Sequence, residues 1–165
     1  MRVFGIAGFK NAGKTTLVVE LIRELTGRGL RLATIKHAHH EFDIDHPGKD
    51  SYLHRDAGAS EVIVGSARRW AHIRELDNQP EPDLDELLSH LGDVDLVLIE
   101  GFKHGEHPRL EIRREGSDAP LIAAEHASVK AVVSDGEVPD SPVPVMDRSN
   151  VAAIADFILQ QTGLR

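Results

Sequence analysis

Apolar runs and amphipathic segments alternate along the chain, a pattern that is typical of α/β proteins. The apolar run at residues 3–7 ends at a glycine and predicts a strand that is buried on both faces. Apolar residues at helical spacing predict a helix over residues 14–28, which Gly27 and Gly29 end. Residues 30–36 predict a second strand. The chain therefore opens with a βαβ unit, whose crossover should be right-handed.

The rest of the chain continues this alternation of strands and helices. The further predicted strands cover residues 61–64, 70–74, 94–99, 110–113 and 131–134. The further predicted helices cover residues 49–59, 83–91 and 150–161. Ser149 is the expected N-cap of the last helix. These elements predict a mostly parallel sheet with helices on both faces, and residues 61–74 are candidates for antiparallel edge strands.

Length and charge limit the classes of protein that this chain can belong to. Its 165 residues predict a single domain over residues 1–165. The absence of cysteine excludes disulfide scaffolds, thiolate metal sites and cysteine nucleophiles. A net charge of -8 argues against a broad nucleic-acid surface, so no nucleic-acid partner is expected. The chain opens on a strand and contains no long apolar stretch, so we expect no signal peptide, no membrane association and a cytoplasmic location.

The loop after the first strand matches the phosphate-binding pattern G-x-x-x-x-G-K-[ST] at every position. Glycines allow tight turns, so the backbone N–H groups converge on phosphates at the N-terminus of the following helix. Lys14 is placed to neutralise the β- and γ-phosphates, the Thr15 hydroxyl to bind Mg²⁺, and Thr16 to contact the α-phosphate. The loop consists of Gly8, Phe9, Lys10, Asn11, Ala12, Gly13, Lys14 and Thr15. The sequence therefore predicts a P-loop NTPase-type fold that binds a nucleoside triphosphate with magnesium.

A P-loop site also needs an acidic group at the end of a nearby strand. The most apolar strand, over residues 94–99, has Asp95 near its start and Glu100 at its end, ~16 Å apart at 3.3 Å per residue. Ligands of open α/β sheets bind at the carboxyl ends of the strands. We therefore expect Glu100 to contact magnesium through water or to orient the attacking water, and Asp95 to have a capping or solubility role.

A polar segment follows the second predicted strand, over residues 36–51, where the switch segments of P-loop proteins lie. Asp43 and Asp45 are candidates for holding magnesium or positioning water. The candidate phosphate contacts are Lys36, His37 and Lys49. Two alternatives stay open: a transition-metal site and a solvated loop without chemistry. The imidazoles of that metal site would be His37, His39 and His40.

Three segments together resemble the MobB family, the small P-loop proteins of molybdenum-cofactor biosynthesis. They are GFKNAGKTTL, KHAHHEFDIDHPGKDSYLHRDAGAS and LVLIEGFK, and the resemblance covers most of residues 1–105. The resemblance implies homodimers that bind GTP with Mg²⁺ and hydrolyse it slowly. It also implies two partners: the MobA-type guanylyltransferase, which joins GMP to molybdopterin, and molybdopterin or its guanine dinucleotide.

The resemblance also implies roles for individual residues. Asp45 and Glu100 would be the acids near the metal and, with Lys14, the catalytic groups. The candidate contacts for phosphate or for the pterin phosphate would be Lys36, Lys49 and Arg55. The N-K-x-D motif of many guanine-specific proteins is absent, and Asp135 is the candidate for its role, with a plain turn aspartate as the alternative. Lys10 does not occupy the position of the additional lysine in the dimerising ATPases.

Other classes of protein compete with this interpretation. A nickel-chaperone GTPase would share the P-loop and the histidines, but such proteins usually add a cysteine, which this chain lacks. A small-molecule kinase would need arginines in a lid, and Arg68-Arg69 and Arg113-Arg114 are poorly placed for it. A non-hydrolysing regulatory subunit is the fourth interpretation. No arginine finger can be placed from the sequence, which fits slow hydrolysis.

Overall fold

The computed structural model describes residues 1–38, 42–102 and 105–164 and divides into two compact units. The first unit comprises Met1–His37 and Leu84–Arg165, and the second comprises Ala38–Asp83. The single domain expected over residues 1–165 stays a prediction. Within the described residues, no helix is both long and apolar enough to cross a membrane.

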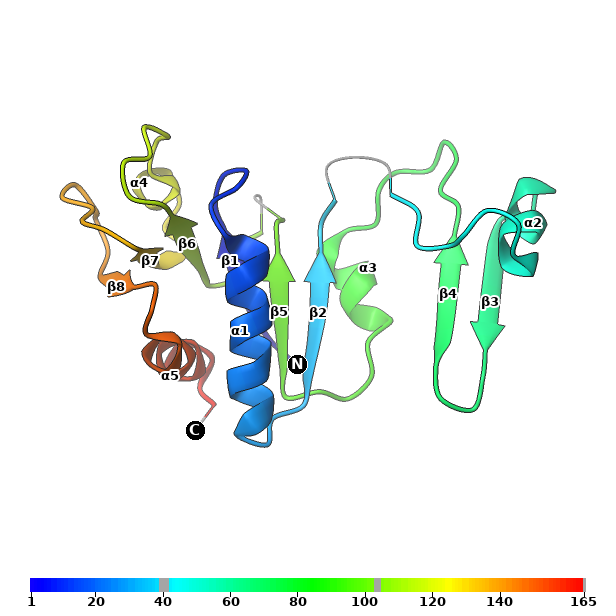
Figure 1. Cartoon of the computed structure of the whole chain (residues 1–165), viewed down its shortest axis with the longest axis horizontal. Coiled ribbons are helices and arrows are strands. Elements are labelled where there is room, and N and C mark those ends of the chain that lie inside the picture. Colours follow the sequence, from blue (N-terminus) through cyan, green and yellow to red (C-terminus); the bar gives the residue numbers. More distant parts are fainter. Residues whose placement is uncertain (39–41, 103–104, 165) are drawn as a thin grey trace. The chain divides into compact units, whose positions relative to one another are not determined.

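A six-stranded parallel sheet forms the centre of the first unit (Figure 1). The strand order is β2-β5-β1-β6-β7-β8, and every neighbouring pair is parallel. The strands are β1 (Arg2–Ala7), β2 (Leu32–Lys36), β5 (Leu96–Glu100), β6 (Arg109–Arg113), β7 (Val129–Ser134) and β8 (Val145–Asp147). Since parallel strands end at the same edge, the segments after β1, β5, β6 and β7 share one edge of the sheet.

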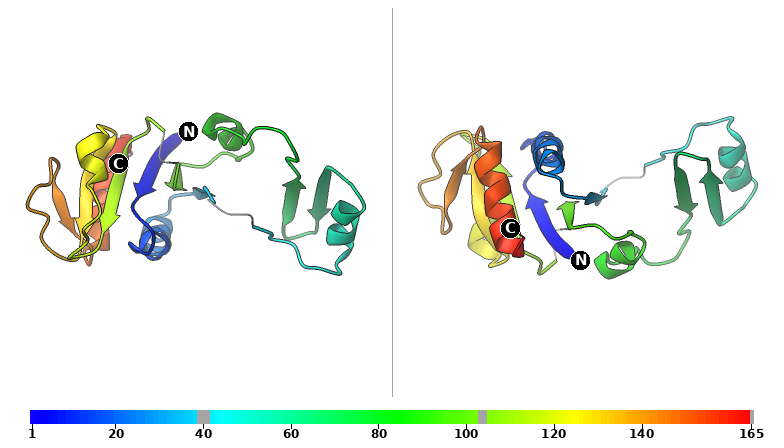
Figure 2. Two further views of the ribbon diagram at one scale, coloured as in Figure 1. Left: turned by 90° about the horizontal axis from the view of Figure 1, so that it is seen from above. Right: turned by 90° about the horizontal axis from the view of Figure 1, so that it is seen from below.

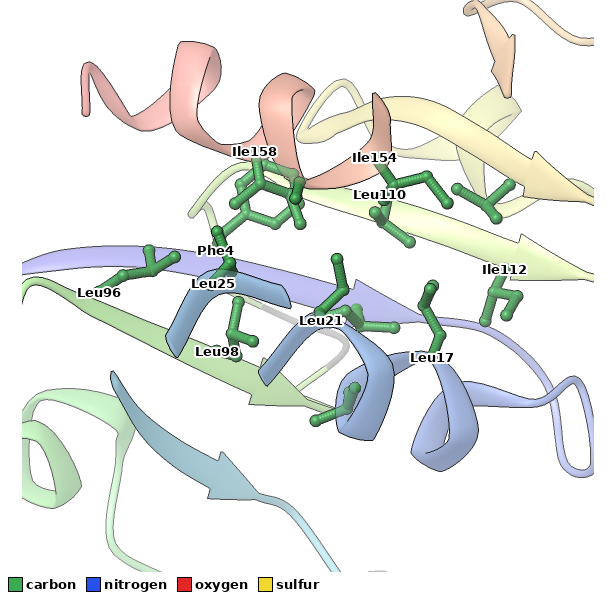
Figure 3. Close-up of a cluster of buried hydrophobic side chains, with 14 residues drawn as sticks. Phe4, Leu17, Leu21, Leu25, Leu96, Leu98, Leu110, Ile112, Ile154 and Ile158 are labelled. Carbon is green, nitrogen blue, oxygen red and sulfur yellow. The ribbon is translucent and has the colours of Figure 1, made fainter. Parts of the chain in front are cut away.

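Helices cover both faces of this sheet. The helices of the first unit are α1 (Lys14–Gly27), α3 (Leu84–Ser89), α4 (Ile122–Glu125) and α5 (Val151–Thr162). Figure 2 shows α1 and α3 on opposite sides of β2 and β5. The helices α1 and α5 pack together on one face, where Phe4, Leu21 and Ile158 are fully buried (Figure 3). On the other face, leucines of α3 pack against Val97 and Ile99. The predicted α/β class, with its mostly parallel sheet, is confirmed.

The second unit contains the helix α2 (Asp50–Asp56) and the strands β3 (Glu61–Gly65) and β4 (Trp70–Arg74). The two strands pair antiparallel, with Ile63 opposite His72. They form a two-stranded sheet of their own, so the expected antiparallel pair exists but is not an edge of the main sheet. Strands β3 and β4 pair with each other and not with a strand of the main sheet. The alternation of apolar and polar residues alone could not determine this pairing.

Local details differ from the sequence-based expectations at a few points. The N-cap of α5 is Asn150, whose Oδ1 accepts a hydrogen bond from the Ala153 N–H at 3.1 Å, so the prediction of Ser149 was wrong. Ser149 instead donates from its N–H and hydroxyl to Asp147 Oδ1, both at 2.8 Å. The short elements α4 and β8, of four and three residues, were not predicted because they are too short to show a periodicity.

Candidate functional site

The loop from Gly8 to Thr15 connects the carboxyl end of β1 to the first turn of α1 (Figure 1). Asn11 and Gly13 adopt positive φ angles of 63° and 97°, so the loop curls back on itself before the helix begins. Gly8 has a φ of 151°, and a Cβ there would lie 2.5 Å from the Ile112 carbonyl oxygen of β6. The backbone therefore approaches the neighbouring strand so closely that this position requires glycine.

Lys14 lies at the end of this loop with its ammonium folded over the loop backbone. Its Nζ donates hydrogen bonds to the carbonyl oxygens of Gly8 and Phe9, both at 2.8 Å. Lys10 and Asn11 are exposed on the loop, Ala12 is half-buried, and Thr16 is exposed in the first turn of α1. The sequence-predicted loop residues are thus gathered in one place, with a cation at their centre.

Thr15 and Glu100 meet at the carboxyl end of β5. The Thr15 hydroxyl donates to Glu100 Oε1 at 2.9 Å, and Lys36 Nζ lies 3.6 Å from the same oxygen. The parallel pairing explains the meeting, because Glu100 lies opposite Ile6 of β1 and opposite Lys36 of β2. The Glu100 side chain is 11% exposed, whereas that of Lys36 is 61% exposed. A hydroxyl, a carboxylate and an ammonium therefore converge beside the loop.

Asp95 directly precedes β5 and so lies at the end of the strand opposite to Glu100. Its Oδ2 accepts a hydrogen bond from the Arg31 N–H at 2.7 Å, and its own N–H donates to the Arg31 carbonyl at 2.8 Å. Asp95 thus fastens the start of β5 to the residue before β2, and it lies away from the loop.

Asp45 belongs to the second unit, where an arginine and a serine surround it. Its Oδ1 accepts from the Ser51 hydroxyl at 3.0 Å, and its Oδ2 lies 3.6 Å from Arg55 Nε. Arg55 also pairs with Asp43 at 2.8 Å and with Glu75 at 2.5 Å. Hydrogen bonds to these carboxylates raise the pKa of Arg55, and the bond to Arg55 lowers the pKa of Asp43. Asp45 and Arg55 are therefore bound to each other, and their expected roles toward metal and phosphate stay predictions.

The histidines proposed as a transition-metal site can be followed only in part. His39 and His40 lie outside the described residues. The His37 ring packs on the Phe102 ring with centroids 4.8 Å apart. Over residues 1–38, 42–102 and 105–164, no group of three or more His, Asp or Glu side chains is arranged to hold a metal ion. Lys49 is exposed and directly precedes α2, without a side-chain cap.

Asp135 lines a pocket of about 610 Å³ at the carboxyl ends of β7 and β8. Residues 134–139 and 145–147 form its walls. Asp135 Oδ1 accepts a hydrogen bond from the Glu115 N–H at 2.6 Å. Asp147 lies in the same pocket, and its bonds from the Ser149 N–H and hydroxyl lower its pKa. The pocket is therefore acidic and lies at the same sheet edge as the phosphate loop.

Sequence reasoning did not place Arg114 at this edge. Its Nε donates to the Asn11 carbonyl oxygen in the phosphate loop at 3.0 Å. The signal was present as the Arg113-Arg114 pair, but the order of the strands was needed to bring β6 beside β1.

The sequence also did not indicate the basic pair formed by His107 and Arg109 at the start of β6. Arg109 is 1% exposed, and a Cβ on Gly5 would lie 2.7 Å from His107 Nε2, so the imidazole is wedged against β1. Burial, and then the neighbouring Arg109, lower the pKa of His107 to about 4. His107 is therefore neutral at pH 7, and it lies beside Gly5 in the middle of β1 and not at the carboxyl end, where the phosphate loop begins.

A parallel sheet that carries a phosphate loop between its first strand and first helix defines the class of P-loop NTPase-like proteins. Within this class, residues 3–135 match the model of the family "Molybdopterin guanine dinucleotide synthesis protein B", MobB. The chain belongs to this family, which confirms the resemblance seen in the sequence and favours it over the nickel-chaperone and kinase alternatives.

Individual relatives agree with this assignment. The chain is 41% identical to the molybdopterin-guanine dinucleotide biosynthesis adapter protein of Escherichia coli (strain K12), over 96% of this chain and 91% of that protein. It is 36% identical to the Haemophilus influenzae protein of the same name, over 94% and 86% of the two chains. A crystal structure of molybdopterin-guanine biosynthesis protein B is similar with a TM-score of 0.73 and 30% identity, over 98% of this chain and 99% of that chain. The structure of Bacillus subtilis MobB gives a TM-score of 0.78 at 25% identity, with 98% of both chains covered.

Proposed function

We propose that this protein binds GTP with Mg²⁺ in the loop from Gly8 to Thr15, hydrolyses it slowly, and serves as an adapter in the synthesis of molybdopterin guanine dinucleotide. The observation that carries the proposal is the hydrogen bond between Thr15 and Glu100 beside the phosphate loop. It joins the two oxygen donors that a P-loop protein uses around magnesium. The pathway is supported by the names of the relatives, which are adapter proteins of this synthesis.

The residues beside the loop fit the ion and the phosphates. A hydroxyl and a carboxylate are hard oxygen donors, which Mg²⁺ prefers, so Thr15 and Glu100 would hold it directly or through water. The bound ion would neutralise charge on the phosphates. Lys14, now bonded to two neutral carbonyls, would turn its ammonium to the β- and γ-phosphates, where a full negative charge binds it more strongly. Lys36, which lies beside Glu100, would contact the γ-phosphate.

The acidic pocket after β7 supports guanine as the base. Guanine presents two adjacent N–H donors, and a carboxylate accepts both. One oxygen of Asp135 accepts the Glu115 N–H, and the described residues form no other hydrogen bond to this carboxylate. Its second oxygen and the remaining lone pair of Oδ1 are then available to the two N–H donors of the base. Adenine has no matching donor pair and would leave the oxygen that faces the base without a hydrogen bond, which costs affinity.

The second unit supports a homodimer and a protein partner. Six large apolar side chains of this unit are exposed: Phe42, Ile44, Leu53, Ile63, Val64 and Trp70. A two-stranded hairpin is marginally stable without a further apolar surface, so burial of these side chains against another protein surface would stabilise it. We assign this surface to a second copy of the chain, and we assign the adapter role to an encounter with a MobA-type guanylyltransferase that uses molybdopterin.

Thermal unfolding with nucleotides tests the proposed function. GTP with magnesium should raise the melting temperature more than ATP does, and Lys14→Ala should abolish the shift. Glu100→Gln should reduce hydrolysis more than binding, because the amide keeps the bond to Thr15 but loses the charge. Equal stabilisation by GTP and ATP would contradict the guanine preference. Tight GTP binding by Lys14→Ala would contradict the site itself.

Light scattering tests the dimer. A double substitution of Ile63 and Trp70 to serine should yield a monomer, because it removes apolar area from the exposed hairpin. The matched control is Val145→Ser, which removes an exposed apolar side chain from the first unit and should leave the dimer intact. A variant of the hairpin that stays dimeric would place the interface elsewhere.

A further inference from the structure

The residue that follows β6 reaches into the phosphate loop. Arg114 Nε donates to the Asn11 carbonyl oxygen at 3.0 Å, and Asn11 is the residue whose positive φ of 63° makes the loop turn. A second bond stabilises the same turn, from the Ala12 N–H to the Phe9 carbonyl at 3.2 Å. Arg114 therefore braces the loop at its most constrained residue.

The next residue along the chain reaches in the other direction. The Glu115 N–H donates to Asp135 Oδ1 at 2.6 Å, at the wall of the acidic pocket. The Glu115 side chain also lies against Gly136, where a Cβ would be 2.5 Å from its Cγ. Two consecutive residues thus connect the phosphate loop to the carboxylate of the pocket.

The strand order places these two contacts between the phosphate loop and the pocket. Strand β6 lies between β1, which leads into the phosphate loop, and β7, which leads into the pocket. A nucleotide with its phosphates on the loop and its base in the pocket has to pass the end of β6, with its α-phosphate and ribose beside Arg114. Arg114 is exposed, and its two terminal amino groups form no hydrogen bond with the described residues.

We propose that the corner formed by Arg114 and Glu115 couples phosphate binding to base selection: Arg114 holds the phosphate loop and contacts the α-phosphate, and the Glu115 amide fixes the Asp135 carboxylate toward the base. This inference rests on the proposed GTP binding and deepens it. Arg114 is a binding and positioning residue on the base side of the loop, opposite the Thr15–Glu100 corner. Its contribution is therefore the same for GTP and GDP, since both carry the α-phosphate.

Calorimetric titration of the full chain with GTP, GDP and ATP in the presence of magnesium tests the coupling. Arg114→Ala should weaken GTP and GDP binding by about tenfold each, because it removes a charge-assisted contact. Arg114→Lys should recover part of the loss, since an ammonium reaches one acceptor but not two. The control is Arg23→Ala, which removes an exposed arginine from α1. Melting of each variant without nucleotide should match the wild type.

A double-mutant cycle separates coupling from two independent contacts. Asp135→Asn should reduce the preference for GTP over ATP while keeping an acceptor for the Glu115 N–H. If the corner couples the two sites, the GTP affinity of the double variant falls clearly less than the product of the two single losses. Strictly multiplicative losses, or an Arg114→Ala affinity equal to that of Arg23→Ala, would overturn the inference and leave GTP binding intact. A wild-type protein that binds no nucleotide would overturn the proposed function and this inference together.

Discussion

The two units of this chain are stabilised in different ways. The first unit buries a continuous apolar core on one face of its sheet and further clusters on the other. Among the described residues of the second unit, Val62 is the one large apolar side chain that is buried. That unit instead carries the ion pairs of Arg55 with Asp43 and Glu75. The phosphate loop therefore stands on a sheet with a packed apolar core, whereas the second unit has ion pairs and little buried apolar surface.

The largest expected effect comes from removing packing in the first unit. Leu21 of α1 is fully buried between the sheet and α5, so Leu21→Ala should lower the free energy of unfolding by about 3 kcal/mol. Urea denaturation measures this loss. The matched control in the second unit is Leu53→Ala on α2, measured at a protein concentration low enough to keep the chain monomeric, where the leucine is 51% exposed and the loss should be below about 0.5 kcal/mol. Equal losses at the two leucines would contradict the difference between the units.

The next effect is a pH dependence that originates in the first unit. Burial lowers the pKa of His107 to about 4, below its ordinary value of 6.5, so the unfolded chain binds the proton more readily. The contribution of neutral His107 is complete above pH 6.5 and is lost as the pH falls toward 4. Because the residue as a whole is half-buried, we expect about 2 kcal/mol of destabilisation between pH 7 and pH 4 from it.

Stability measured by urea from pH 4 to pH 8 checks this expectation. His107→Gln should flatten the difference between pH 7 and pH 4 relative to the wild type. His126→Gln, which replaces an exposed histidine of the same unit, should leave the profile unchanged. An identical profile for the wild type and His107→Gln would show that His107 does not carry the acid sensitivity.

The contrast between the units also explains which features the sequence could predict. The phosphate loop is encoded locally, because its glycines, Lys14 and the first turn of α1 are adjacent in the chain. The position of Glu100 followed from one rule, that ligands bind at the carboxyl ends of parallel strands. Arg114 could not be placed, since its contact with Asn11 spans about a hundred residues and depends on which strands pair. The separation of β3 and β4 into their own sheet is non-local in the same sense.

A smaller effect distinguishes two neighbouring polar residues at the start of α5. Asn150 caps the helix through Oδ1, so Asn150→Ala should lower the free energy of unfolding by about 1 kcal/mol. Ser149→Ala is the matched control and should cost less, because the Ser149 N–H keeps its bond to Asp147 Oδ1 when the hydroxyl is lost. Thermal or urea unfolding of the two variants compares them directly. A larger loss of unfolding free energy for Ser149→Ala than for Asn150→Ala would indicate that Ser149 is the N-cap, as the sequence pattern predicted.

Replacement of Arg55 should have the smallest effect on the global free energy of unfolding. Its effect on hydrogen exchange should be confined to the second unit. Arg55→Ala leaves Asp43, Asp45 and Glu75 without their shared cation, so their carboxylates repel one another within the second unit. Hydrogen exchange followed by mass spectrometry should show faster exchange across residues 50–74 and unchanged exchange in β1, β5 and β6.

Arg68→Ala, at an exposed position of the β3–β4 turn, controls for the loss of one positive charge. Since the second unit has so little buried apolar surface, its backbone amides should exchange faster, while the amides of the parallel sheet that carries the phosphate loop stay protected. Faster exchange throughout the parallel sheet would instead mean that the scaffold depends on this ion-pair network.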